Sequence, residues 1–135
     1  MRPGKGVLDT SVVILLDQLE EGGDLPEEPL ITAITLAELS VGPLVTDDER
    51  ERAARQARLQ LTEASFDPLP FDVSAARAFG RVAAELRQSG RKSRARSFDA
   101  MIAATALARG LPVYTANAKD LEGIEGLEVV SVAVD

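Results

Sequence analysis

KGVLDTSVVILLDQL, residues 5–19, is the stretch that decides the fold. Its apolar run at 6–8 ends at Asp9, and after Thr10 and Ser11 the apolar residues return with helical spacing. A buried strand that turns directly into a helix is typical of parallel α/β sheets. The segment predicts a strand at 6–9 and a helix over 11–20. Asp9 at the turn is then either a helix N-cap or part of a functional site.

The rest of the chain continues the alternation of strands and helices. We predict strands at 30–34, 111–116 and 127–132, helices at 35–42, 46–64, 72–90 and 97–110, and a short extended piece at 66–71. This order implies a parallel sheet covered by helices on both faces. We therefore expect one domain over residues 1–135, a three-layer α/β/α sandwich with a central parallel sheet of four to five strands.

The composition excludes several kinds of chemistry. The 135 residues carry a net charge of −7 and contain neither histidine nor cysteine. Serine–histidine triads, histidine acid–base pairs, thiolate nucleophiles and disulfides are thereby excluded, and zinc would lack its preferred ligands. Carboxylates are plentiful, and they suit hard cations such as Mg²⁺ or Mn²⁺. The sequence shows neither a signal peptide nor a stretch of the ~20 apolar residues that a membrane helix needs, so we expect a cytoplasmic protein.

Three acids and one amide stand where chemistry could occur, although each has a simpler interpretation. Asp9 ends a strand, Glu38 and Asp99 lie near helix starts, and Asn117 follows the strand at 111–116. Thr35-x-x-Glu38 matches a capping box, in which the glutamate reaches back to the cap amide, and Thr46 and Glu49 repeat that spacing. An acid in the first turn of a helix, such as Asp99, ordinarily favours the helix dipole.

The joint pattern points further. Sites in parallel sheets form beyond the carboxyl ends of the strands, where Asp9 and Asn117 fall. Asp99 shares its helix face with apolar residues, so its carboxylate should point along a buried side, and a buried acid needs a partner or a metal. Acids that converge at one sheet edge would repel each other unless a divalent cation lay among them.

These residues resemble the PIN domains, and within them the VapC-type toxins of bacterial type II toxin–antitoxin systems. The resemblance covers nearly the whole chain, through LDTSVVI (8–14), ITLAELSVG (34–42) and the second half from residue 80 to 130. It implies that Asp9, Glu38 and Asp99 are the three core acids. The fourth position falls at Asn117, which is often Asp in the family, and Asp120 follows in a PIN-like place with Leu121 where the family has an aromatic residue. By the same resemblance, the supporting hydroxyls are those of Thr10, Ser11 and Thr115.

The resemblance implies an Mg²⁺- or Mn²⁺-dependent endoribonuclease that leaves a 5′-phosphate and a 3′-hydroxyl. The lack of histidine agrees, because cleavage through the ribose 2′-hydroxyl would be without its usual acid and base. It also implies a cognate VapB-type antitoxin and a homodimer. The alternatives are a PIN-like nuclease of RNA processing and a non-catalytic PIN scaffold. A phosphate-receiver or phosphatase-like domain would need a second acid beside Asp9 or a D-x-D pattern, and both are missing.

Two charged segments offer surfaces for partners. The segment 87–97 places a run of basic residues directly before Asp99, which is either a solvated loop or a guide for RNA phosphates. Its members closest to Asp99 are Arg91, Lys92, Arg94 and Arg96. The helix at 46–64 sets four arginines opposite a stripe formed by Ala53, Ala54, Ala57 and Leu61, and this stripe is compatible with a partner surface.

Overall fold

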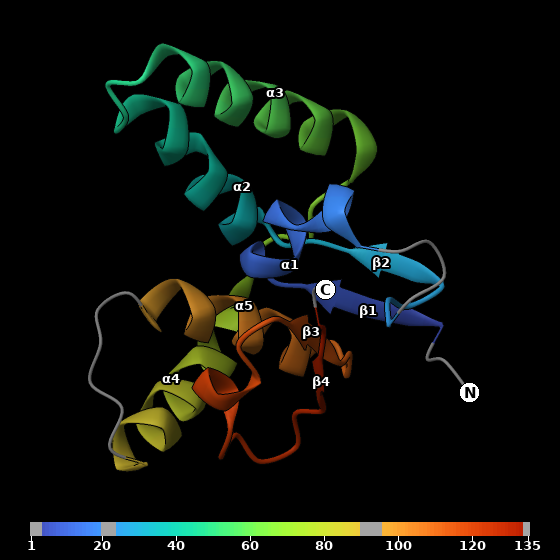
Figure 1. The fold of residues 1–135 in the computed structure, drawn as a ribbon. Coiled ribbons are helices and arrows are strands. Elements are labelled where there is room, and N and C mark those ends of the chain that lie inside the picture. The colour runs from blue at the N-terminus through green and yellow to red at the C-terminus, as the bar shows by residue number, and fades with distance from the viewer. Residues whose placement is uncertain (1–3, 20–23, 90–95, 134–135) are drawn as a thin grey trace.

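The fold is a parallel four-stranded sheet with helices on both faces (Figure 1). The structure is a computed structural model that describes residues 4–19, 24–89 and 96–133. The strands are β1 (Lys5–Leu8), β2 (Glu28–Leu30), β3 (Val113–Thr115) and β4 (Val129–Ser131). Their order across the sheet is β2-β1-β3-β4, and every neighbouring pair is parallel. The predicted α/β sandwich with a four- to five-stranded parallel sheet is therefore confirmed.

The helices form the two outer layers. They are α1 (Thr10–Ile14), α2 (Ala33–Val41), α3 (Glu49–Ser65), α4 (Val73–Gln88) and α5 (Arg96–Ala108), with short 3-10 turns at Leu16–Gln18, Gly42–Leu44 and Ala118–Leu121. In Figure 1, α1, α2 and α3 lie on one side of the sheet, and α4 and α5 lie on the other. α3 folds back along α2 after the turn at Gly42–Leu44, and α5 contacts both α4 and α2.

The alternation of side chains along the strands builds a core on each face of the sheet. Val7 and Val113 belong to the cluster that contains the buried residues of α4 and α5. Leu8 and Tyr114, the next residues along the same strands, pack with the residues of α1 and α2. Because successive side chains of a strand point to opposite faces, apolar pairs such as these require cover on both sides.

The second strand lies earlier in the chain than predicted. β2 is Glu28–Leu30 instead of 30–34, and α2 already begins at Ala33. The oxygen of the Thr32 side chain accepts the Thr35 amide at 3.3 Å, so Thr32 caps the helix. After β2 the chain pairs with the predicted extended piece, since the Leu69 amide donates to the Ile31 carbonyl at 2.9 Å and Leu69 accepts from Ala33.

The first helix is shorter than predicted. It ends at Ile14 and continues only as a 3-10 turn. Residues 12–14 are all β-branched, and such a run lowers helix propensity because its side chains lose rotamer freedom. The three long helices lie within two or three residues of their predicted bounds. Within the described ranges, no helix has the length and apolarity that a membrane crossing demands.

Candidate active site

The order of the strands places a site at the carboxyl ends of β1 and β3. From β1 the chain goes to β2 on one side of β1, and it later enters β3 on the other side. The order of the strands therefore reverses between β1 and β3. In parallel sheets this switch point is where ligands bind. Asp9 directly follows β1, and Ala116 and Asn117 follow β3. The Asp9 amide donates to the Tyr114 carbonyl at 3.0 Å, which ties the two strand ends together.

Asp9 is both a helix cap and the centre of a polar cluster, so the two interpretations of the sequence are compatible. Its side chain is 5% exposed, and its Oδ1 accepts the Val12 amide at 3.2 Å as the N-cap of α1. The Ser11 hydroxyl donates to the same oxygen at 2.5 Å and accepts the Ala116 amide at 3.1 Å. The Thr115 hydroxyl also hydrogen-bonds to Asp9. Ser11 and Thr115, the predicted supporting hydroxyls, thus both hydrogen-bond to Asp9, and their role in a metal site stays a prediction.

Glu38 meets the hydroxyl of Thr10 across the gap between α2 and α1. Thr10 Oγ1 lies 2.6 Å from Glu38 Oε1 and 3.1 Å from Thr35 Oγ1. A hydroxyl has a single proton, which the charged carboxylate attracts more strongly, so Thr35 is left to donate to Thr10. The two threonines and Glu38 thus form one chain of hydrogen bonds.

The capping-box interpretation of Glu38 is wrong. Thr32 caps α2, and Glu38 lies in the middle of the helix, with its carboxylate on Thr10. The repeat of that pattern is also not a cap. Asp48 caps α3 and accepts the amides of Arg50 and Glu51 at 2.9 and 3.1 Å.

The two acids are poorly solvated and lie within electrostatic reach of each other. Burial raises the pKa of Asp9 above its ordinary value, against the opposing effect of hydrogen bonds from Ser11, Thr115 and the Val12 amide. Burial also raises the pKa of Glu38; the Thr10 hydroxyl opposes this shift, and the charge of Asp9 adds to it. Such paired, desolvated carboxylates are typical of sites that hold a cation.

The remaining predicted ligands lie less closely around this pair. Asp99 is in the first turn of α5, half-buried, next to buried apolar residues of the same helix. Asn117 is exposed at the start of the Ala118–Leu121 turn, and its backbone N–H donates to the Thr115 hydroxyl at 3.0 Å. Asp120 is half-buried in that turn. Over residues 4–19, 24–89 and 96–133, no three acids stand close enough together to form a ready metal-binding group. The ligand roles of Asp99, Asn117 and Asp120 therefore stay predictions.

The predicted RNA-guiding segment lies largely outside the description. Arg91, Lys92 and Arg94 are not among the described residues, and of Arg96 only its backbone place as the first residue of α5 is described.

The donor set around Asp9 and Glu38 fits a hard divalent cation. It consists of oxygen atoms only: those of two carboxylates, whose charged form is disfavoured by burial, and those of three hydroxyls that hydrogen-bond to these carboxylates. Mg²⁺ and Mn²⁺ prefer such oxygen ligands, and supporting hydrogen bonds are a usual feature of metal sites.

The sequence analysis missed Thr35 as part of the cluster. Thr35 is fully buried, and its hydroxyl extends the chain of hydrogen bonds to Glu38. The signal was present, because Thr32, Thr35 and Glu38 recur every three residues and so lie along one face of a helix. The spacing of Thr35 and Glu38 also matches a capping box, and that match conceals the role of the Thr35 hydroxyl.

Comparison with known proteins places the chain in a family. The model of the PIN domain matches residues 6–126. Ribonuclease VapC5 of Mycobacterium tuberculosis is 41% identical over 96% of this chain and 97% of its own length. The crystal structure of VapBC-5 from the same organism, described as a member of the VapBC family of toxin–antitoxin systems, has a chain that matches with a TM-score of 0.82, covering 96% of this chain and all of that one. A chain of the DNA-bound VapBC structure from Salmonella typhimurium matches at 27% identity and a TM-score of 0.72, over 96% of this chain and 97% of that one. The resemblance is confirmed, and the protein belongs to the PIN-domain family, among relatives that are VapC ribonucleases.

Proposed function

We propose that this chain is the toxin of a VapBC-type toxin–antitoxin pair, an endoribonuclease that hydrolyses phosphodiester bonds of RNA. The observation that carries this proposal is the pair of buried Asp9 and half-buried Glu38 at the carboxyl edge of the sheet, in a PIN domain whose relatives are VapC ribonucleases. A scaffold without catalytic activity would have no need to keep two desolvated carboxylates in each other's field, which costs stability.

The nuclease depends on Mg²⁺ or Mn²⁺, held by Asp9, Glu38 and Asp99, with Asn117 or Asp120 as a further ligand. When bound, the cation supplies a Lewis acid for hydrolysis of the phosphodiester, which leaves a 5′-phosphate and a 3′-hydroxyl. The protein's own residues prepare for it. Thr10 and Ser11 each donate a hydrogen bond to one carboxylate, which fixes its direction and favours its ionised form.

The absence of histidine from the whole chain favours the same route. Cleavage through the ribose 2′-hydroxyl needs a general base and a general acid near neutral pH, and histidine is the side chain that usually serves. Hydrolysis aided by a divalent cation does not depend on histidine, because the cation would make the attacking water more acidic and water could return a proton to the leaving 3′-oxygen. The carboxylates of the site are the ligands that would hold such a cation.

The partner is a VapB-type antitoxin, and the toxin forms a homodimer that acts in the cytoplasm, where RNA is translated. An apolar surface for such association is available on the outward side of α3. Leu61 is 68% exposed, and Ala53, Ala54 and Ala57 are exposed beside it. This exposed apolar stripe is compatible with a partner surface.

The test is cleavage of a defined mixture of structured RNAs by the purified, antitoxin-free protein. Reactions are titrated with Mg²⁺ and Mn²⁺, with a chelator and the Asp9→Asn variant as controls. Cuts that require both the cation and Asp9, and that end in a 5′-phosphate, are expected. Cuts that persist in chelator, or in Asp9→Asn, would contradict the metal-dependent mechanism.

A further inference from the structure

A pocket of about 380 Å³ opens beside the candidate active site. Thr10 and Glu38 line it on one side, Arg55 and Arg58 of α3 line it on another, and Ile14 and Leu39 supply apolar wall. The pocket is therefore continuous with the hydrogen-bonded chain that ends on Glu38. Its volume lies within the usual range for small-ligand sites. Four of its eight lining residues are charged, two acids and two arginines, so it is suited to a polar ligand.

The guanidinium of Arg55 is bound by other groups of the protein. Its Nε lies 2.9 Å from Glu51 Oε1, and its Nη1 donates to the Gly42 carbonyl at 2.8 Å. The side chain passes so close to Gly42 that an added Cβ there would lie 3.2 Å from Arg55 Cδ. This arginine therefore fastens α3 to the end of α2.

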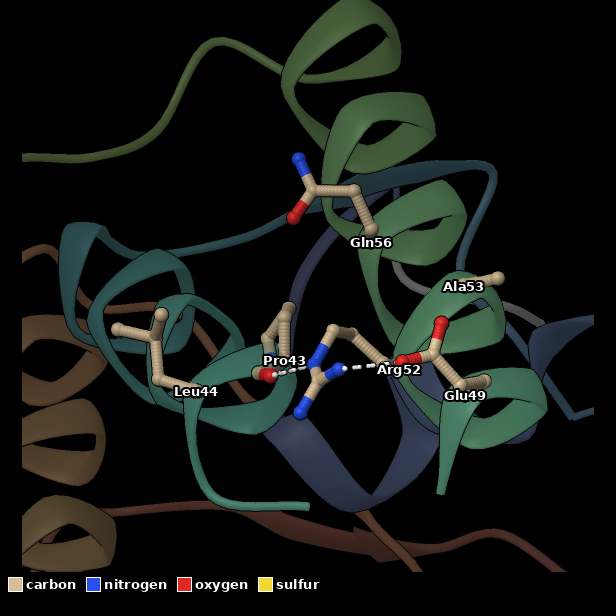
Figure 2. Close-up of a pocket in the computed structure, with 6 residues that line it drawn as sticks. All are labelled: Pro43, Leu44, Glu49, Arg52, Ala53 and Gln56. Atoms are coloured by element: carbon tan, nitrogen blue, oxygen red, sulfur yellow. Dashed lines mark hydrogen bonds and ion pairs between the residues drawn. The ribbon is translucent and has the colours of Figure 1, made fainter. Parts of the chain in front are cut away.

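Arg52, one turn earlier, is also bound by other groups of the protein. Figure 2 shows its guanidinium between Pro43 and Glu49, in a separate pocket of about 460 Å³. Nε donates to the Pro43 carbonyl at 3.1 Å, Nη1 lies 3.3 Å from Glu49 Oε1, and Nη2 donates to the Thr46 carbonyl at 2.5 Å. That pocket has no cation left for a ligand among its lining residues.

Arg58 differs from both. It is half-buried on the same side of α3, yet within the described part of the chain its guanidinium makes neither an ion pair nor a hydrogen bond. Its backbone carbonyl accepts from the Thr62 hydroxyl at 2.7 Å, a contact that leaves the side chain free. Of the two carboxylates that line the pocket, Glu38 is bonded to Thr10 and Glu51 is bonded to Arg55. A half-buried guanidinium that has no partner in the described part of the protein, next to a candidate nuclease site, is available to bind an anionic group of a ligand.

We infer that Arg58 is a substrate-binding residue that contacts a backbone phosphate of the RNA nucleotide next to the bond that is cut. This inference rests on the proposed function. The planar fork of a guanidinium matches a phosphate with two parallel hydrogen bonds, which an ammonium cannot do. The apolar wall of Ile14 and Leu39 is suited to the sugar or base of the same nucleotide. In a protein with a net charge of −7, a placed cation of this kind is what RNA affinity requires.

The test measures RNA binding apart from cleavage. The probe is a fluorescently labelled single-stranded oligo(U), and its anisotropy is followed in chelator over a series of salt concentrations. Arg58→Gln should weaken binding about tenfold, the loss expected for one charge-assisted contact. It should also reduce the slope of log affinity against log salt by about 0.7, the value for one phosphate of a single strand. Arg58→Lys should restore the slope in part.

The matched control is Arg50→Gln on the exposed side of the same helix, which removes one positive charge and should bind as the unmodified protein does. In cleavage assays with the divalent cation, Arg58→Gln should raise KM more than it lowers kcat. Equal losses in Arg50→Gln and Arg58→Gln would show diffuse attraction and overturn the inference, as would an unchanged affinity and slope. A loss confined to antitoxin binding would also overturn it and assign Arg58 to that partner. Because binding is measured in chelator, a failure of metal-dependent cleavage would leave this result standing.

Discussion

The hydrogen bond from Thr10 to Glu38 offers the sharpest test of the site, because it can be removed without changing the shape of the side chain. Thr10→Val keeps the branched volume and removes the hydroxyl that lies 2.6 Å from Glu38 Oε1. A hydrogen bond to a charged group contributes about 1.5–3 kcal/mol. If this bond holds Glu38 in its working direction, the loss corresponds to about a tenfold to hundredfold drop in kcat/KM.

The pH profile separates this role from mere packing. Burial and the charge of Asp9 raise the pKa of Glu38, and the Thr10 hydroxyl opposes them by favouring the ionised form. Without the hydroxyl the pKa rises further, so the acidic limb of the activity profile should move to higher pH in Thr10→Val. Thr10→Ser, which keeps the hydroxyl, should retain the profile of the unmodified protein. An unmoved limb with full activity in Thr10→Val would refute the assignment of Glu38 to the site.

Four other changes should have separable effects. Asp99→Asn should remove most RNA cleavage while circular dichroism stays unchanged; retained cleavage would remove Asp99 from the site. Asp9→Asn should abolish cleavage and raise the melting temperature of the chelator-treated protein. Burial raises the pKa of Asp9, so the folded state holds that proton more tightly, and the unmodified protein loses stability as pH rises from the ordinary Asp pKa to the raised one. Gly6→Ala should cost about 1–3 kcal/mol in denaturant titrations, because its Cβ would overlap the buried tyrosine ring of β3. Gly4→Ala, with open space around it, should be neutral. Leu61→Glu should weaken the antitoxin complex or the homodimer in size-exclusion chromatography, and unchanged elution of both would argue against the α3 surface.

The sequence predicted those parts of the fold that depend on hydrophobic patterning. The buried strand before Asp9 and the long helices follow from the period of their apolar residues, and their positions in the structure agree. The predictions failed where a single polar side chain had two possible partners. Thr35 and Glu38 have the spacing of a capping box, and local spacing cannot reveal that Thr10, 28 residues before Glu38, competes for the carboxylate. Likewise, β2 could not be located from local pattern, because the competing partner of residues 31–33 is Leu69, distant in sequence.

The orientation of α3 explains why the guanidinium of Arg58 has no partner among the described residues. Arg52, Arg55 and Arg58 are half-buried on the inner side of α3, whereas its alanines and Leu61 face outward. The carbonyl groups at the end of α2 need donors, which favours this orientation. Arg52 and Arg55 reach the carbonyls of Pro43, Thr46 and Gly42. Three further residues advance the helix by about 4.5 Å and place Arg58 at the pocket that Glu38 and Leu39 of α2 also line. Among the described residues, its guanidinium has no hydrogen bond to a carbonyl. The arginines that bind α3 to the end of α2 are thus followed by Arg58, whose guanidinium lies at the pocket without a partner among the described residues, and this is the arrangement that a phosphate contact requires.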